Sequence, residues 1–128
     1  MPTTDKITDA VAEYARRLKA GDPARIAALY AEDATVEDPA GSAVRKGREA
    51  IAAFYAELDG LALTAELLTV RASGDTAAFH LRVVTTTDEF VSSIEPIDVM
   101  TFDEQGRITS MRAIWSPADV VHRRRSDQ

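Results

Sequence analysis

Two aspartates stand where a carboxyl group could do chemistry, and Asp38 is the first. The run Ala34–Asp38 reads as a short strand that stops at Pro39, a residue that biases Asp38 toward extended backbone. Because strand side chains alternate, Asp38 shares a face with Val36 and lies at the edge of any cavity that this strand lines. A carboxylate placed there can act as a general base, although aspartate before proline is also a common way to begin a turn.

Asp98 is the second, and it interrupts an apolar strand face. Alternation along Ile94–Phe102 groups Asp98 with large apolar neighbours, which are Ile94, Pro96, Met100 and Phe102. Burial there penalises the ionised form, so the pKa of Asp98 should rise and the protonated carboxyl could donate a hydrogen bond. The spacing leaves one alternative open, a structural aspartate paired with Arg82 or Arg112.

Tyr14 is a candidate because it lies on a buried helical stripe. A helix predicted over residues 5–20, capped by Thr4 or Asp5, has these inward residues at helical spacing: Ile7, Val11, Tyr14 and Leu18. A buried phenol needs a hydrogen-bond partner, so another polar group should lie beside Tyr14. Gly21 should end the helix in the left-handed conformation.

Two more helices should help to position these three side chains. One begins at Asp22-Pro23, ends near Ala31, and directs three residues inward, Ile26, Leu29 and Tyr30. The other lies between Gly47 and Gly60, and its inward stripe is Ile51, Phe54, Tyr55 and Leu58.

The rest of the chain changes to a strand-like pattern. Segments 62–72, 77–87, 90–102 and 107–116 are rich in Val, Ile, Thr and Phe, and hairpin turns are expected at Gly74-Asp75 and Gln105-Gly106. Helices followed by a meander of strands predict an α+β fold in which one curved sheet wraps around a helix layer.

Alternation divides that sheet into two faces of different character. One face is nearly all apolar and includes Asp98, together with Phe79, Leu81, Val83, Met100, Met111, Ala113 and Trp115. The other is mixed, with His80, Arg82 and Arg112 beside Ile97, Val99 and Ile114. A half-apolar outer face often contacts a second subunit, so a homodimer through the sheet is expected.

Length and composition restrict the function classes. The 128 residues suit one domain, expected over 1–121, with a short polar tail at 122–128 that should be frayed. A formal net charge of −6 argues against nucleic acid as a partner, and the apolar runs are too short to span a membrane. Cysteine is absent and the histidines are only His80 and His122, which disfavours a metal site. The absence of cysteine also fits a cytoplasmic protein, and the N-terminal residues lack the pattern of a signal peptide.

The three candidate residues lie in segments that together resemble bacterial ketosteroid isomerase. The resemblance covers nearly the whole chain and is carried by Leu29–Pro39, Gly47–Tyr55 and Ile97–Arg107. It implies a cone-shaped, curved mixed sheet wrapped around three N-terminal helices, the roll shared with nuclear transport factor 2 and with cystatin-like proteins. Relatives with this fold perform several functions, so the fold alone does not define the activity.

The resemblance also implies a role for individual residues. Asp38 matches the general base, and Tyr14 and a protonated Asp98 match the oxyanion hole; the contrast between the two carboxyls is a known property of that family and is taken from it. Tyr30 and Tyr55 match tyrosines that support the Tyr14 phenol, and Trp115 matches an indole that donates toward the base. Further pocket residues would be Phe54, Phe79, Leu81, Met100, Met111 and Ala113.

The activity implied is a cofactor-independent shift of a 3-oxo-Δ5-steroid to its 3-oxo-Δ4 isomer. A hydrophobic, steroid-like molecule would be the ligand, and a dienolate would form as a proton moves from carbon 4 to carbon 6. Alternatives on the same scaffold are a dehydratase, a polyketide cyclase or an epoxide hydrolase, the last of which would require an Asp-Arg-Asp set. A non-catalytic module for ligand binding or dimerisation is a further alternative.

Overall fold

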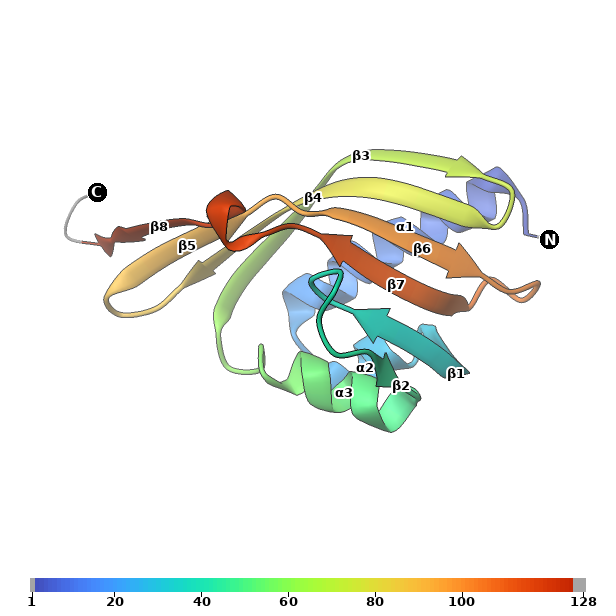
Figure 1. The fold of residues 1–128 in the computed structure, drawn as a ribbon, viewed down its shortest axis with the longest axis horizontal. Helices are drawn as coiled ribbons and strands as arrows, with labels where there is room; N and C mark the ends of the chain where they lie inside the picture. The colour runs from blue at the N-terminus through green and yellow to red at the C-terminus, as the bar shows by residue number, and fades with distance from the viewer. Residues whose placement is uncertain (1, 126–128) are drawn as a thin grey trace.

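A curved, mixed β-sheet packs on one side against helices in the computed structural model, which describes residues 2–125 (Figure 1). The helices are α1 (Thr4–Ala20), α2 (Pro23–Ala27) and α3 (Arg48–Ala56). The strands are β1 (Tyr30–Glu37), β2 (Arg45–Lys46), β3 (Ala62–Ser73), β4 (Thr76–Thr86), β5 (Phe90–Ile94), β6 (Ile97–Phe102), β7 (Ile108–Ile114) and β8 (Val121–Arg124). A short 3₁₀ turn, Pro117–Asp119, precedes β8. The predicted α+β class is therefore confirmed.

The strand order explains the mixed character of the sheet. Along the sheet the order is β2-β1-β7-β6-β4-β5-β8, and β3 pairs with the other edge of β4. The β1–β7 pair is parallel, and the remaining pairs are antiparallel. Strands β6 and β5 lie one after the other along the same edge of β4, so β4 spans the length of the sheet.

Helix α1 forms for the reasons that its pattern predicts. Its buried residues are Ile7, Val11, Tyr14, Ala15 and Leu18, which make one stripe against the sheet. The cap is one residue earlier than expected, because the Thr3 side chain accepts a hydrogen bond from the Lys6 amide at 3.2 Å. Gly21 ends the helix at φ 80°, as predicted.

The predicted end of the second helix is wrong. Helix α2 stops at Ala27, and Tyr30 begins strand β1 instead of completing a helical stripe. The Ile108 amide donates to the Leu29 carbonyl at 3.0 Å, so pairing with β7 draws the chain into the sheet at this point. Tyr30 is still fully buried, as expected. Helix α3 likewise ends at Ala56, before the turns that lead to Gly60.

The segment predicted as one strand over 90–102 is two strands. The ladder breaks at Glu95 and Pro96 between β5 and β6, because proline has no amide hydrogen to donate. The carbonyl of Pro96 still accepts a hydrogen bond from the Leu81 amide at 3.3 Å, which keeps the break beside β4.

The predicted faces of the sheet are largely confirmed, and one bulge corrects them. Phe79, Leu81, Met100, Met111 and Ala113 are all buried, whereas Ile97 and Ile114 are exposed. Alternation along the last predicted strand groups Ile108 with Arg112 and Ile114 and so predicts it on the outer face. Ile108 is instead fully buried, since the β6–β7 register shifts between Thr101 and Phe102 and turns Ile108 inward.

The C-terminal segment was expected to be frayed from residue 122, and this is wrong up to Arg124. Val121–Arg124 form β8, which pairs with β5 from Phe90 to Ser93. These side chains are exposed, which agrees with the polar character of His122, Arg123 and Arg124, whereas Val121 is an exposed apolar residue. Residues 126–128 of the predicted tail lie outside the described residues.

Candidate active site

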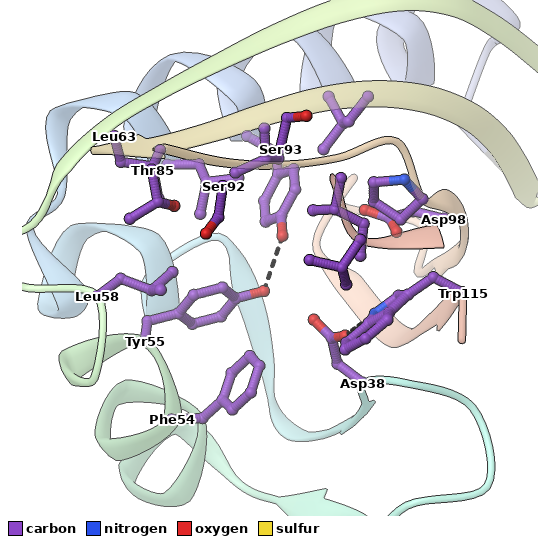
Figure 2. Close-up of a pocket in the computed structure, with 17 residues that line it drawn as sticks. Asp38, Phe54, Tyr55, Leu58, Leu63, Thr85, Ser92, Ser93, Asp98 and Trp115 are labelled. Carbon is purple, nitrogen blue, oxygen red and sulfur yellow. Dashed lines mark hydrogen bonds between the residues drawn. The ribbon is translucent and has the colours of Figure 1, made fainter. Parts of the chain in front are cut away.

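A cavity of about 330 Å³ opens between the helices and the inner face of the sheet. Its lining is mostly apolar and comes from α1, from α3 and the turn after it, and from the inner face of the sheet (Figure 2). The lining residues are Tyr14, Leu18, Asp38, Phe54, Tyr55, Leu58, Leu63, Leu81, Val83, Thr85, Ser92, Ser93, Ile94, Pro96, Asp98, Trp115 and Val120. The cavity thus brings together Tyr14, Asp38 and Asp98, which lie far apart in the sequence.

Asp98 is placed in the cavity wall by β6, where its neighbours on the strand face are apolar. Its side chain is only 3% exposed, and the Oδ1 atom has no hydrogen-bond partner among residues 2–125. Burial, together with the negative charge of Asp38, raises the pKa of Asp98 to about 8. At neutral pH the Asp98 carboxyl is therefore mainly protonated, and its Oδ1 atom has no partner within the described residues.

The alternative of a structural Asp98–arginine pair is wrong for the described residues. Arg112 lies on the outer face of the sheet, where its Nε donates to Glu37 Oε1 at 3.1 Å. Arg82 is exposed on the outer face of β4, as alternation predicts. Asp98 is consequently not neutralised by a guanidinium but by its own proton.

Three tyrosines form a chain of phenols behind the cavity. The Tyr14 hydroxyl lies 2.9 Å from the Tyr55 hydroxyl, which lies 2.7 Å from the Tyr30 hydroxyl. Helices α1 and α3 and strand β1 supply one tyrosine each. Burial raises the pKa of all three phenols, so they remain protonated. If Tyr30 donates to Tyr55 and Tyr55 to Tyr14, the Tyr14 hydrogen is left to point at a ligand.

Asp38 occupies the opposite wall, directly after β1. The Trp115 indole Nε1 donates to Asp38 Oδ1 at 2.7 Å, and the Asp38–Pro39 peptide bond is cis. The following loop is fixed to β7, because the Ala40 amide donates to the Ala113 carbonyl at 2.8 Å. Burial raises the pKa of Asp38, while the Trp115 hydrogen bond and the Arg45 charge oppose that rise.

The remaining predicted residues divide into two groups. Phe54, Tyr55, Leu81 and Trp115 line the cavity with the three candidate residues. Tyr30, Phe79, Met100, Met111 and Ala113 are buried in the core and do not line the cavity. Phe79 supports the site indirectly, because its ring packs edge-on against Tyr14 with centroids 6.1 Å apart.

Sequence reasoning missed several residues of the site. Thr85 follows Leu81 and Val83 on the inner face of β4, so alternation could have identified it. Ser92 has no comparable signal, because its position depends on how β5 pairs with β4. Arg45 was also missed; its guanidinium lies 4.6 Å from the Phe54 ring centroid.

The site can therefore hold an apolar molecule between a hydrogen-bond donor pair and a carboxylate. Tyr14 and protonated Asp98 can stabilise negative charge that develops on an oxygen, and Asp38 can accept a proton. Between residues 2 and 125, no group of three or more His, Asp or Glu side chains could hold a metal ion. Over the same residues, no helix combines the length and apolar character needed to cross a lipid bilayer.

Comparison with known proteins finds a relative that is similar over most of the chain. A curated relative from Nocardioides simplex, named Steroid Delta-isomerase, is 52% identical over 116 residues, which cover 91% of this chain and 94% of the relative. The resemblance inferred from the sequence is thereby confirmed.

Two solved structures share the fold over nearly their whole length. One is SalBIII, described as an epoxide hydrolase/cyclase-like enzyme with a role in pyran ring formation in the polyether salinomycin. Its TM-score is 0.85 and its sequence identity 32%, and the match covers 91% of this chain and 95% of SalBIII. The other is RV0760c from Mycobacterium tuberculosis, with a TM-score of 0.86, 25% identity, and coverage of 96% and 100%.

The family model for the SnoaL-like domain matches residues 11–111, a span that includes Tyr14, Asp38 and Asp98. The geometry of the cavity, the curved sheet and this match agree: the chain belongs to the SnoaL-like domain family.

Proposed function

We propose that the protein is a cofactor-independent steroid Δ-isomerase that converts 3-oxo-Δ5-steroids to 3-oxo-Δ4-steroids. One observation carries the proposal: Asp98 is buried, lacks a partner for Oδ1 among the described residues, and shares an apolar cavity with Tyr14 and Asp38. The 52% identity to a protein named Steroid Delta-isomerase supports it independently.

The reaction begins with proton removal by Asp38. The ionised carboxylate takes the proton from carbon 4 of the substrate, and the electrons of that C–H bond move toward the 3-oxygen to give a dienolate. The same carboxyl, now protonated, returns the proton to carbon 6. The double bond thereby moves into conjugation with the ketone, and no atoms are gained or lost.

Tyr14 and Asp98 stabilise the dienolate between these two proton transfers. Each donates a hydrogen bond to the 3-oxygen, whose negative charge is greater in the dienolate than in the ketone. Such donors in a site without water are each worth about 10²–10³ in rate. The Tyr55 and Tyr30 hydroxyls support Tyr14 through a hydrogen-bond chain, and polarisation along the chain strengthens the final donor.

Trp115 holds Asp38 in place for both transfers. Its 2.7 Å hydrogen bond fixes one carboxyl oxygen and leaves the other free to approach carbons 4 and 6. Because a donated N–H favours the ionised carboxylate, this contact also limits the rise in the pKa of Asp38 that burial causes.

An absorbance assay with 5-androstene-3,17-dione tests the function directly. The product is a conjugated enone, so turnover should produce a growing ultraviolet band that the substrate lacks. Buffer alone and the Asp38→Asn variant serve as controls for spontaneous isomerisation. Absence of an enzyme-dependent band would reject the proposal, and an epoxide substrate tested in parallel would then examine the alternative of an epoxide hydrolase.

We also propose that two copies associate through the outer face of the sheet. Ile97 and Ile114 are 43% and 44% exposed there and form a cross-strand pair between β6 and β7. A second subunit would remove both apolar side chains from water, which is the physical basis for this proposal. Sedimentation that finds only monomer at micromolar concentration would reject this proposal.

A further inference from the structure

The cavity has a second polar region at the end away from the two aspartates. Figure 2 shows Asp38, Asp98 and Trp115 on one side of the cavity and Leu63, Thr85 and Ser92 on the other. The lining between them is apolar and includes Leu81 and Val83. Successive inward residues of a strand are roughly 7 Å apart, so the wall from Leu81 to Thr85 suits a molecule of several fused rings.

The two hydroxyls of this distal region and the imidazole beside them belong to three paired strands. Thr85 of β4 lies opposite Ser92 of β5, and Ser92 in turn lies opposite His122 of β8. The Ser92 Oγ and His122 Nδ1 atoms are 2.5 Å apart, so one hydrogen bond fixes the Ser92 rotamer. The His122 ring stacks on Phe90 with centroids 4.4 Å apart, which holds the imidazole in turn.

These hydroxyls still have capacity for a ligand. A serine hydroxyl has one donor and two acceptor sites, and His122 uses only one of them. The Thr85 hydroxyl makes no hydrogen bond within residues 2–125. The mechanism proposed above uses neither residue, so their place in an otherwise apolar lining requires another explanation.

We propose that Ser92, oriented by His122, and Thr85 bind an oxygen substituent on the steroid ring farthest from the 3-oxo group. This inference rests on the proposed isomerase function and specifies its substrates as steroids that are oxygenated at both ends. When the 3-oxygen meets Tyr14 and Asp98, the long axis of the ring system follows the cavity wall toward Thr85. A 17-oxo group would accept from Thr85, and also from Ser92 when His122 Nδ1 carries a hydrogen and donates it to Ser92 Oγ. In the other tautomer Ser92 donates to His122, and a 17-hydroxyl could then donate to Ser92 Oγ.

The test compares two substrates that differ only at the distal end, 5-androstene-3,17-dione and 5-androsten-3-one. Ser92→Ala and Thr85→Val should each lower kcat/KM for the 17-oxo substrate by about three- to tenfold, mainly through KM, as expected for loss of one hydrogen bond. Activity toward 5-androsten-3-one should stay near that of the wild type. Thr86→Val is the matched control, because the adjacent Thr86 lies on the other face of β4 and outside the cavity lining.

Other outcomes separate this inference from the proposed function. Suppose that the wild type turns over both substrates, and that Ser92→Ala and Thr85→Val change kcat/KM for both equally or for neither. The proposed recognition of the distal oxygen is then wrong, while the isomerase function is retained. If the wild type turns over neither substrate, the function is wrong. Binding of 17β-estradiol and of its 17-deoxy analogue, measured by calorimetry, then tests distal recognition alone: equal effects of Ser92→Ala on both affinities would overturn it.

Discussion

The two cavity walls that carry Asp98 and Asp38 give the same side chain opposite properties. On the β6 wall, Asp98 has apolar neighbours and no partner for Oδ1 within the described residues, and its pKa rises to about 8. On the β1 wall, Asp38 is also partly buried, but an indole N–H and the charge of Arg45 favour its ionised form. One carboxyl is thus suited to donate a hydrogen bond and the other to accept a proton.

The two walls differ both in burial and in the partners that they give the carboxyl. Burial raises the pKa of both carboxyls, and only Asp38 has groups that oppose the rise. The charge on Asp38 raises the pKa of Asp98 further, so ionisation of one favours protonation of the other. Variants that exchange or remove these partners therefore test the comparison.

Asp38→Asn should have the largest effect, because it removes the base from its wall. A positioned general base contributes typically ~10²–10⁴ in rate, so kcat should fall by that amount while the affinity for a product steroid changes little. Steady-state kinetics and a binding titration measure the two quantities. Near-normal turnover in this variant would show that the proton is taken by another group.

Asp98→Leu should lower kcat by about 10²–10³, since it removes one donor to the dienolate oxygen. Asp98→Asn retains an N–H donor and should lose less. In the wild type, kcat/KM should fall as the pH rises past about 8, because Asp98 then ionises and can no longer donate. Asp98→Asn should lack this basic limb, and an identical pH profile in both proteins would contradict the assignment.

Protein stability should depend on pH through Asp98 as well. Its pKa in the folded state is about 8, compared with the ordinary value of 3.8, so between these pH values the folded protein holds a proton that the unfolded chain has released. Stability should therefore fall as the pH rises from 5 to 8, by roughly 2–4 kcal/mol. Urea unfolding at both pH values would detect this, and Asp98→Asn should remove most of the difference.

Trp115→Phe should have the smallest effect, because it removes only the donor that favours ionised Asp38. The pKa of Asp38 should rise, so kcat/KM at pH 5 should fall by about three- to tenfold relative to wild type. Rates above pH 7 should change less, since Asp38 is then ionised in both proteins. An acid limb that does not move would mean that the Trp115 contact only maintains the loop.

The sequence predicted the inner face of the sheet better than the ends of the elements. Alternation is a strict period of two, so it placed Asp98 and Met100 correctly without knowledge of strand partners. The end of α2 was missed because Leu29 and Tyr30 fit a helical stripe, and only the pairing of β1 with β7 draws them into the sheet. Ile108 was misplaced because a bulge depends on the register of two strands.

The same reasoning explains which parts of the site could be predicted. Tyr14 and Asp98 carry polar groups in apolar patterns, which a sequence displays directly. Asp38 precedes a proline, and its role as a base was implied by the family resemblance. The proximity of Ser92 to the cavity depends on tertiary pairing, and β8 was missed because an exposed polar strand resembles a disordered tail. The hydrogen bond from Trp115 to Asp38 joins residues 77 positions apart, so the family resemblance implied it although no local pattern spans that distance.

The interruption at Glu95 and Pro96 has a consequence for how such a protein can diversify. It separates β6, which bears the hydrogen-bonding carboxyl of Asp98, from the arm formed by β5 and β8. Because the backbone ladder is not continuous across Pro96, mutations that reshape the arm need not displace the catalytic groups. Substrate specificity can therefore change during evolution while the positions of the catalytic side chains are retained.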